Sequence, residues 1–107
     1  MAYTPERGDV VWIDFDPVIG HEQGGHTPAL VLSPQSYNQA TGMMLCCPIT
    51  TKIKGYPFEV EIAGKVKSVV LSDQLTCVDW KARKVAFKSV VTAIEIAEVR
   101  AKFKVLV

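Results

Sequence analysis

Short apolar segments rich in β-branched and aromatic residues recur along the whole chain, separated by glycine, proline and small polar residues. Such segments are typical of β-strands. The strand candidates are Val10–Phe15, Ala29–Leu32, Met43–Ile49, Phe58–Ile62, Ser68–Ser72, Leu75–Trp80 and Val85–Val90. Phe58–Ile62 alternates apolar and acidic residues, which is the period-two pattern of a half-exposed strand. The pattern predicts a mainly β fold.

The C-terminal segment has a different pattern, which predicts a helix. Thr92–Glu95 is a capping box, in which the threonine hydroxyl and the glutamate carboxylate each accept a backbone N–H. Apolar residues then recur at helical spacing, with two lysines near the negative end of the helix dipole: Ile96, Val99, Phe103, Lys102 and Lys104. Residues 35–42 have the length of a helical turn or a long loop, with Gly42 as a stop. Together these elements predict a small, strongly bent β-barrel or a paired-sheet fold.

The chain has 107 residues, so we expect residues 1–107 to form one domain with a hydrophobic core. Apolar residues make up 49% and charged residues 21%, which is ordinary for a soluble globular protein. The N-terminus carries no apolar signal segment, and the apolar runs are far too short to span a bilayer. We therefore expect a cytoplasmic protein with no membrane partner.

The three cysteines are expected to be small buried thiols in a reducing compartment. Cys46 and Cys47 are adjacent in a strand, so their side chains point to opposite faces and cannot form a disulfide. Cys77 lies in another strand candidate. No Cys/His spacing resembles a zinc site, and His21 and His26 lie five residues apart on a glycine-containing loop. The sequence therefore predicts no metal.

Charge is distributed unevenly along the chain, although the net charge is only +1. Residues 1–50 carry one base and five acids, whereas residues 51–107 carry eleven bases and six acids. Such an asymmetry fits a basic face for phosphates beside an acidic loop, and it equally fits a mixed, solvated surface.

The stretch from Gly20 to Pro34 joins a polar loop to a buried strand. Adjacent glycines at positions 24 and 25 let the backbone turn, and proton-handling or hydrogen-bonding side chains surround them: His21, Glu22, Gln23 and His26. A loop of this kind, anchored on a rigid strand, is a common place for function. Composition alone favours a plain hairpin loop with solvated side chains.

Several short motifs occur in a fixed order along the chain. They are Gly8-Asp9-Val10, Asp14-Phe15-Asp16-Pro17, Gly20-x-Glu22-Gln23-Gly24-Gly25-His26-x-Pro28, Leu32-Ser33-Pro34, Tyr37-Asn38, Thr41-Gly42, Pro48-x-Thr50-Thr51, Lys54 through Val60, Leu71-x-Asp73-Gln74, and Trp80 with Arg83. In combination they resemble the MazF/PemK (Kid) toxins of bacterial toxin–antitoxin pairs. The resemblance covers essentially the whole chain, although no single motif would be specific.

The resemblance implies a mainly β fold with short helices, namely a small SH3-like β-barrel of five to seven strands with a C-terminal helix. It also implies a homodimer that cleaves single-stranded mRNA at short sequences without metal or cofactor. The expected products carry a 2′,3′-cyclic phosphate and a 5′-hydroxyl. The implied partner is an antitoxin whose flexible acidic tail occupies the RNA groove.

The resemblance further implies roles for individual residues. The RNA's own 2′-hydroxyl attacks, so the enzyme needs a base, an acid for the leaving oxygen, and donors for the phosphorane. Thr50 matches the threonine that donates a hydrogen bond to the phosphate, although a threonine at a strand end can also cap its own turn. Glu22 and Gln23 match loop residues beside the scissile group. Asp73 and Gln74 match a pair that faces the groove, where Gln74 suits a base edge.

Other residues are candidates for binding the RNA. Lys54 can neutralise a phosphate, and Phe15 or Tyr56 can stack on a base. Phe15 fits the barrel core equally well. Base edges are expected to meet four polar side chains: Asp16, Gln23, His26 and Gln74.

Position 27 departs from the family pattern, which places a catalytic arginine immediately before Pro28. Thr27 is short and neutral, so it cannot act as a proton-transfer acid at ordinary pH. Losing one donor to the charge of a transition state typically costs roughly 10²–10³ in rate. His26 can carry a proton, but neighbours in an extended segment project to opposite sides. Arg7 or Arg83 would have to reach in from elsewhere in the fold.

Three explanations of Thr27 stay open: an inactivated version of an active toxin, a natural relative with weak or relocated chemistry, or a protein that binds without cleaving. The first is favoured, because everything around position 27 fits the active pattern. An alternative function is a non-catalytic SH3-like barrel that binds RNA or a peptide through an aromatic groove. Its candidate residues are Trp12, Phe15, Tyr56 and Trp80. A more distant alternative is a metal-dependent hydrolase with Asp14, Asp16 and His21 as ligands.

Overall fold

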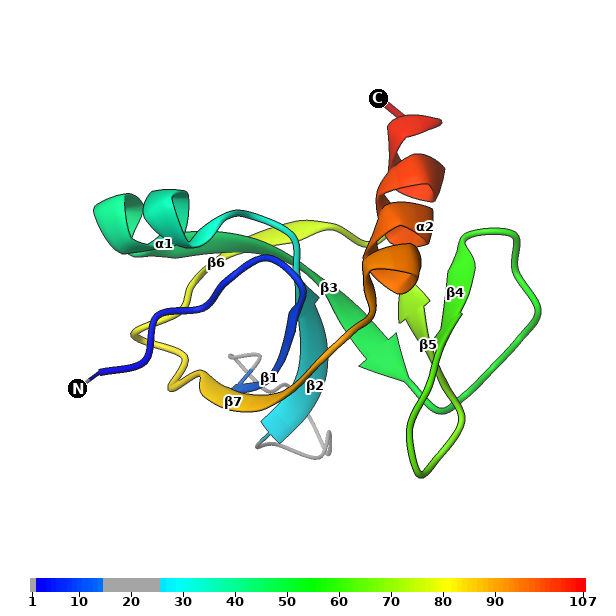
Figure 1. Cartoon of the computed structure of the whole chain (residues 1–107), viewed down its shortest axis with the longest axis horizontal. Coiled ribbons are helices and arrows are strands. Elements are labelled where there is room, and N and C mark those ends of the chain that lie inside the picture. Colours follow the sequence, from blue (N-terminus) through cyan, green and yellow to red (C-terminus); the bar gives the residue numbers. More distant parts are fainter. Residues whose placement is uncertain (1, 15–25) are drawn as a thin grey trace, which may run out of the picture.

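The computed structural model describes residues 2–14 and 26–107. Seven strands and two helices follow one another along these residues (Figure 1). They are β1 (Asp9–Asp14), β2 (His26–Val31), α1 (Gln35–Thr41), β3 (Met43–Thr50), β4 (Glu59–Ile62), β5 (Ser68–Leu71), β6 (Thr76–Asp79), β7 (Ala86–Val90) and α2 (Ala93–Lys104). The predicted mainly β fold with a C-terminal helix is confirmed.

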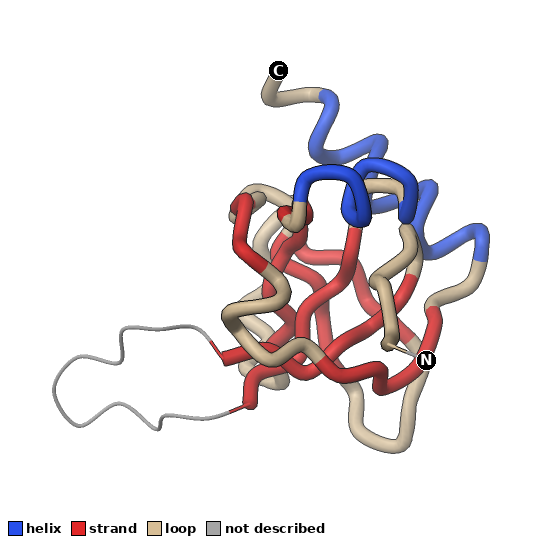
Figure 2. Tube along the Cα trace, turned by 90° about the vertical axis from the view of Figure 1, so that its left-hand side faces the viewer, coloured by secondary structure: helices blue, strands red, loops and turns tan. Residues whose placement is uncertain are grey.

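All strand pairs are antiparallel, and the strand order is β4-β5-β3-β2-β1-β7, with β6 also pairing β3. The long strand β3 holds the sheet together. Its first half, Met43–Cys46, pairs with β6, and its last residues, Ile49 and Thr50, pair with β5. Because β3 changes partner along one edge, the sheet curls into a half-barrel with both helices at one end (Figure 2).

Strands β1, β2 and β3 carry apolar side chains on both faces of the sheet, and each face packs against a separate core cluster. One cluster contains Val10, Leu30 and Cys47 together with Val99 of α2. The other contains residues of the opposite parity on the same three strands: Val11, Ile13, Ala29, Val31 and Cys46. Alternation of side chains along a strand explains this division. The prediction that Cys46 and Cys47 point to opposite faces is confirmed.

Cys77 corrects one expectation, because its side chain is exposed rather than buried. In β6 it is Val78, the next residue, that faces the second cluster. Since neighbours in a strand alternate, Cys77 faces away from the core. The apolar character of the segment predicted the strand, but it did not say which residues face inward.

The C-terminal end of α1 and the N-terminal end of α2 are formed by the residues that the sequence predicted. Gly42 has a φ of +73° after α1, and its N–H donates to the Asn38 carbonyl. At α2, the Thr92 Oγ1 accepts from the Glu95 N–H at 3.1 Å, and the Glu95 carboxylate accepts from the Thr92 N–H at 2.8 Å. The predicted capping box is therefore confirmed. No helix within residues 2–14 and 26–107 has the length and apolar character needed to cross a membrane.

Candidate functional site

A cavity of about 200 Å³ gathers residues from the end of β3, the following loop and the turn after β5. Five of the predicted site residues line it: Thr50, Lys54, Tyr56, Asp73 and Gln74. Lys52, Glu59 and Leu71 complete the described wall. Residues more than twenty positions apart in sequence thus meet in one place, because β5 returns alongside β3.

Thr50 is the last residue of β3 and lies opposite Val69 of β5. Its neighbour Ile49 is buried in the core, which anchors the strand end. The Thr50 Oγ1 accepts a hydrogen bond from the Lys52 N–H at 3.0 Å. The expected turn-capping role is therefore present. A hydroxyl that accepts one hydrogen bond still has its proton to donate, so this contact orients Thr50 without using its donor.

The loop after β3 is held by a single carboxylate. Glu59 accepts from the Lys54 N–H at 3.1 Å and from the Gly55 N–H at 2.9 Å. Gly55 has a φ of +81°, a conformation that costs glycine little. From the other side, the Lys102 ammonium of α2 donates to the carbonyls of Pro57 at 2.6 Å and Glu59 at 3.1 Å. Although Glu59 lies in the motif of residues 54–60, the sequence assigned no supporting role to Glu59 or to Lys102, since both act through hydrogen bonds to backbone groups that a sequence pattern does not show.

Exposed groups on this loop combine positive charge with an aromatic ring. Lys54 and Tyr56 are both exposed, and the Lys54 Nζ lies 5.8 Å from the centroid of the Tyr56 ring. A cation beside an aromatic face suits a ligand with a phosphate and a base. The arrangement is chemically consistent with single-stranded nucleic acid.

The turn after β5 contributes the exposed pair Asp73 and Gln74 to the opposite wall. The Gln74 N–H donates to the Leu71 carbonyl at 3.1 Å, and the Ser72 N–H donates to the Phe58 carbonyl at 3.0 Å. These bonds fix the turn against the loop. Burial, and then the negative charge of Asp73, raises the pKa of Cys47 to about 12. The Cys47 thiol is therefore inert at neutral pH, and it does not compete as a nucleophile.

Thr27 lies half-buried on β2, opposite Ile13 of β1. The ladder between β2 and β3 pairs Ala29 with Pro48. Continuing that register by two residues leads to Thr27 and Thr50, so both positions lie at the same end of adjacent strands. Thr27 is not among the residues that line the cavity of Thr50.

The two arginines considered as substitutes have other contacts. Arg7 Nε donates to the Leu32 carbonyl at 2.8 Å. Arg83 donates to the Asp14 carbonyl at 3.3 Å. Neither arginine lines the cavity beside Thr50.

Four predicted site residues lie outside the described part of the chain: Phe15, Asp16, Glu22 and Gln23. His26 is placed by its backbone, opposite Asp14. The alternative metal cluster also falls partly outside, because it needs Asp16 and His21. Within the described residues, no group of three His, Cys, Asp or Glu side chains is placed to hold a metal ion.

Of the four aromatic residues named for the alternative peptide-binding groove, Trp80 does not fit and Phe15 lies outside the described residues. Trp80 is 7% exposed, and its Nε1 donates to the Asn38 carbonyl at 2.9 Å. It packs in the second core cluster rather than beside Tyr56. Tyr56 instead shares the cavity of Thr50, Asp73 and Gln74. A peptide groove that needs both aromatic rings is therefore contradicted.

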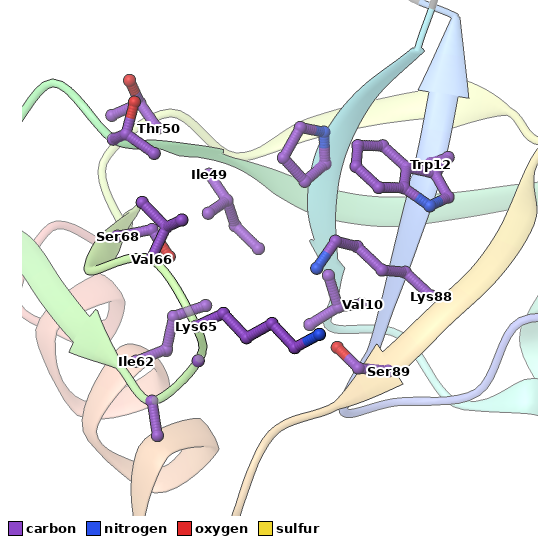
Figure 3. A pocket seen from close by; sticks show the side chains of 14 residues that line it. Val10, Trp12, Ile49, Thr50, Ile62, Lys65, Val66, Ser68, Lys88 and Ser89 are labelled. Atoms are coloured by element: carbon purple, nitrogen blue, oxygen red, sulfur yellow. The ribbon is translucent and has the colours of Figure 1, made fainter.

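A second and larger cavity, of about 560 Å³, lies on the other side of Thr50 (Figure 3). Trp12 and Lys88 stand on one wall, and Lys65 and Val66 extend from the β4–β5 turn on the other. The sequence pattern did not predict this cavity, because its walls come from six strands, β1 to β5 and β7, that are spread along the chain.

Residues 6–107 match the family model described as PemK-like, MazF-like toxin of type II toxin–antitoxin system. The chain is 49% identical over 106 residues to the endoribonuclease toxin MazF of Escherichia coli K12, covering 98% of this chain and 96% of that protein. Among solved structures it resembles a MazE–MazF complex from Deinococcus radiodurans, with a TM-score of 0.90 and 47% identity. That match covers 98% of this chain and 96% of the other.

Proposed function

We propose that this chain is an endoribonuclease toxin, because it belongs to the family of PemK-like, MazF-like toxins of type II toxin–antitoxin systems. Its proposed substrate is single-stranded mRNA, cut at a short sequence without metal or cofactor. The observation that carries the proposal is the convergence of Thr50, Lys54, Tyr56, Asp73 and Gln74 on one cavity.

The chemistry of the cavity fits attack by the ribose 2′-hydroxyl on its own phosphate. Such a reaction gives a 2′,3′-cyclic phosphate and a free 5′-hydroxyl, and it needs no nucleophile from the protein. In this proposal the Thr50 hydroxyl donates a hydrogen bond to a phosphate oxygen, and Lys54 supplies positive charge. Tyr56 stacks on a base, and Gln74 bonds to a base edge.

The loop before β2 belongs to the same proposal. Glu22 is proposed to take part in proton transfer, and Gln23 to bind beside the scissile group. Asp16 and His26 are proposed to contact base edges, and Phe15 to stack. Asp73 would face the same groove, from the wall that it shares with Gln74.

Thr27 lowers the activity expected of this chain. An arginine here would bring a full positive charge to the strand end beside Thr50, whereas a threonine hydroxyl brings none. We therefore propose that the chain is an impaired form of the toxin, with its binding groups retained.

The test compares the chain with its Thr27→Arg variant on mixed-sequence single-stranded RNA in EDTA. We expect the arginine variant to cleave roughly 10²–10³ times faster, since it restores a charged donor for the phosphorane. Its products should carry 2′,3′-cyclic phosphate ends, which sequencing of the ends detects. Adding Thr50→Val to the arginine variant should abolish the gain without unfolding the chain. If the arginine variant leaves the RNA intact at high enzyme concentration, the ribonuclease proposal fails.

The proposed protein partners are an antitoxin with a flexible acidic tail and a second copy of the chain. Solved complexes of the relative MazF with MazE support the first. A tail of negative charge would compete with RNA for Lys54 and its surroundings. We propose the cytoplasm as the site of action, where mRNA is accessible and where the free cysteines Cys46, Cys47 and Cys77 stay reduced.

A further inference from the structure

We infer that helix α2 sets the position of the loop wall that carries Lys54 and Tyr56, and that Lys102 is the positioning residue through which it does so. The inference rests on the proposed function and extends it from residues that face RNA to one that does not. Lys102 lines neither of the two cavities, so its effect on RNA passes through other residues.

One face of α2 carries three anchoring side chains. Glu95, Val99 and Lys102 follow one another at spacings of four and three residues, which places them on the same side of the helix. Val99 is completely buried in the first core cluster, which also contains Ile49, the neighbour of Thr50. Because the middle anchor is fixed in the core, the two polar anchors start from fixed positions.

The two polar anchors hold opposite ends of strand β4, which lies beside α2 (Figure 1). Lys102 donates to the carbonyls of Pro57 at 2.6 Å and Glu59 at 3.1 Å, where the strand begins. Glu95 accepts from the Ala63 N–H at 2.8 Å, one residue after the strand ends. β4 has four residues, and among the described strands it pairs with β5 alone. A short edge strand of this kind is weakly held by its own ladder, so the contacts from α2 fix its place.

A continuous path of hydrogen bonds leads from Lys102 to the residues that face RNA. Lys102 binds the Glu59 carbonyl, and the carboxylate of the same residue accepts from the N–H groups of Lys54 and Gly55. The Glu59 N–H donates to the Tyr56 carbonyl at 3.1 Å. The ammonium group of α2 is thus two contacts away from the backbone of both Lys54 and Tyr56.

Thr50 does not depend on this path. It ends β3, where it lies opposite Val69 of β5, and its Oγ1 is oriented by the Lys52 N–H. Loss of the Lys102 contacts should therefore displace the binding wall and leave the strand end with Thr50 in place. The expected result is weaker binding, seen in turnover as a raised KM with little change in kcat.

The first experiment measures binding without cleavage. The probe is a fluorescent, mixed-sequence single-stranded DNA, which lacks the attacking 2′-hydroxyl. Lys102→Met keeps the apolar stem and removes the ammonium, and we expect it to weaken binding about three- to tenfold. The slope of log affinity against log salt should stay unchanged, because no phosphate contact is removed. A slope smaller by roughly 0.7 would identify Lys102 as a phosphate ligand and overturn the inference.

Two further variants control for charge and for donors. Lys104→Met removes the same charge from an exposed position on the same helical turn, so it should bind nearly as the unmodified chain does. Lys102→Arg keeps N–H donors at the position and should restore most of the affinity. If Lys102→Met lowers only the midpoint of urea unfolding, with DNA affinity unchanged, its role is structural. That result overturns the inference and leaves the proposed function intact.

The second experiment tests the path through Glu59 with a double-mutant cycle. If Lys102 acts through Glu59, the double variant of Lys102→Met and Glu59→Gln should bind DNA within about twofold of Glu59→Gln alone. Fully additive losses would show that Lys102 acts by another route, against the inference.

The third experiment uses cleavage of single-stranded RNA by the Thr27→Arg variant. Adding Lys102→Met should raise KM about three- to tenfold and change kcat by less than about twofold. A fall in kcat with KM unchanged contradicts the positioning role. If the chain and all its variants neither bind DNA nor cleave RNA, the proposed function fails together with the inference.

Discussion

Asn38 is completely buried, yet its polar atoms are well partnered. Its amide nitrogen donates to the carbonyls of Pro5 at 2.8 Å and Ser33 at 3.1 Å, and its amide oxygen accepts from the Ser33 hydroxyl at 2.5 Å. Its backbone carbonyl accepts from the Trp80 indole. One side chain therefore ties the N-terminal segment, α1 and the end of β2 together.

Asn38→Asp should destabilise the chain by about 3 kcal/mol or more, measured by urea unfolding at pH 7. The substitution keeps the shape but replaces two donors with a buried carboxylate facing two carbonyl oxygens. Gln39→Glu is the matched control, since it makes the same charge change on the exposed side of α1. Equal stability of the two variants would contradict the role assigned to Asn38.

The buried thiols and Tyr3 make stability sensitive to alkaline pH. Burial, followed by the neighbouring thiols, raises the pKa of Cys46 from 9.0 to about 12, and burial with Asp73 does the same for Cys47. Burial and then the hydrogen bond to Asp9 raise the pKa of Tyr3 well above its ordinary value. All three groups keep their protons longer in the folded chain than in the unfolded one.

On the alkaline side, the free energy of unfolding should consequently change little between pH about 7 and 8 and fall as the pH rises from about 9 to 12. Over that range the unfolded chain loses protons that the folded chain retains, and this favours unfolding. Urea titrations at several pH values measure the effect. The double variant Cys46→Ala and Cys47→Ala should show a shallower fall than the unmodified chain. An identical slope would contradict the assignment to the thiols.

At the scale of elements, the loop between β3 and β4 is held in place by hydrogen bonds from side chains outside its tip. Glu59 holds the Lys54 and Gly55 amides, and α2 contributes Lys102 from behind. α2 is itself tied to the β4–β5 turn, because Glu95 accepts from the Ala63 N–H at 2.8 Å. The C-terminal helix therefore braces both the core and the loop.

Glu59→Gln should speed hydrogen exchange of the Lys54 and Gly55 amides about tenfold and weaken oligonucleotide binding several-fold. The amide keeps only one good acceptor for two N–H donors. Glu61→Gln, two residues along the same strand, is the control, because its exposed ion pair with Lys67 adds little to stability. Unchanged exchange at both amides in the Glu59 variant would show that the carboxylate does not hold the loop.

At the scale of the whole molecule, β7 forms one edge of the curled sheet. β7 pairs only with β1 among the described strands, and its Phe87 and Val90 side chains are 52% and 64% exposed. Apolar groups on an open edge are usually covered in solution. This agrees with the proposed homodimer.

Sedimentation velocity at micromolar concentration should therefore show a species of twice the 11.8 kDa chain mass. The physical reason is that the exposed apolar side chains of β7 and the C-terminal segment, Phe87, Val90, Ile94 and Leu106, leave water when a second copy covers them. A dilution series provides the control, since a true dimer keeps its sedimentation coefficient until the dissociation constant is reached. A monomer throughout the micromolar range would contradict the dimer.

The sequence by itself determined the local features and the family. Short runs rich in β-branched and aromatic residues predicted the strands, the capping box at Thr92 predicted the start of α2, and Gly42 predicted the end of α1, because each signal depends on residues within a few positions of one another. The ordered motifs predicted Thr50, Asp73 and Gln74 as candidate site residues one by one, but not the cavity that they line together.

Tertiary structure decided what depends on strand pairing. Because β3 pairs with β5 at its end, the turn of Asp73 and Gln74 lies beside Thr50. The curl of the sheet also forms the larger cavity that Trp12 lines. In and after β6, the Cys77 side chain is exposed and the Trp80 side chain is buried in the core. These outcomes arise from register and curl, which are set by contacts between residues far apart in the chain. The residue pattern of one strand does not specify which other strand pairs with it, or along which edge.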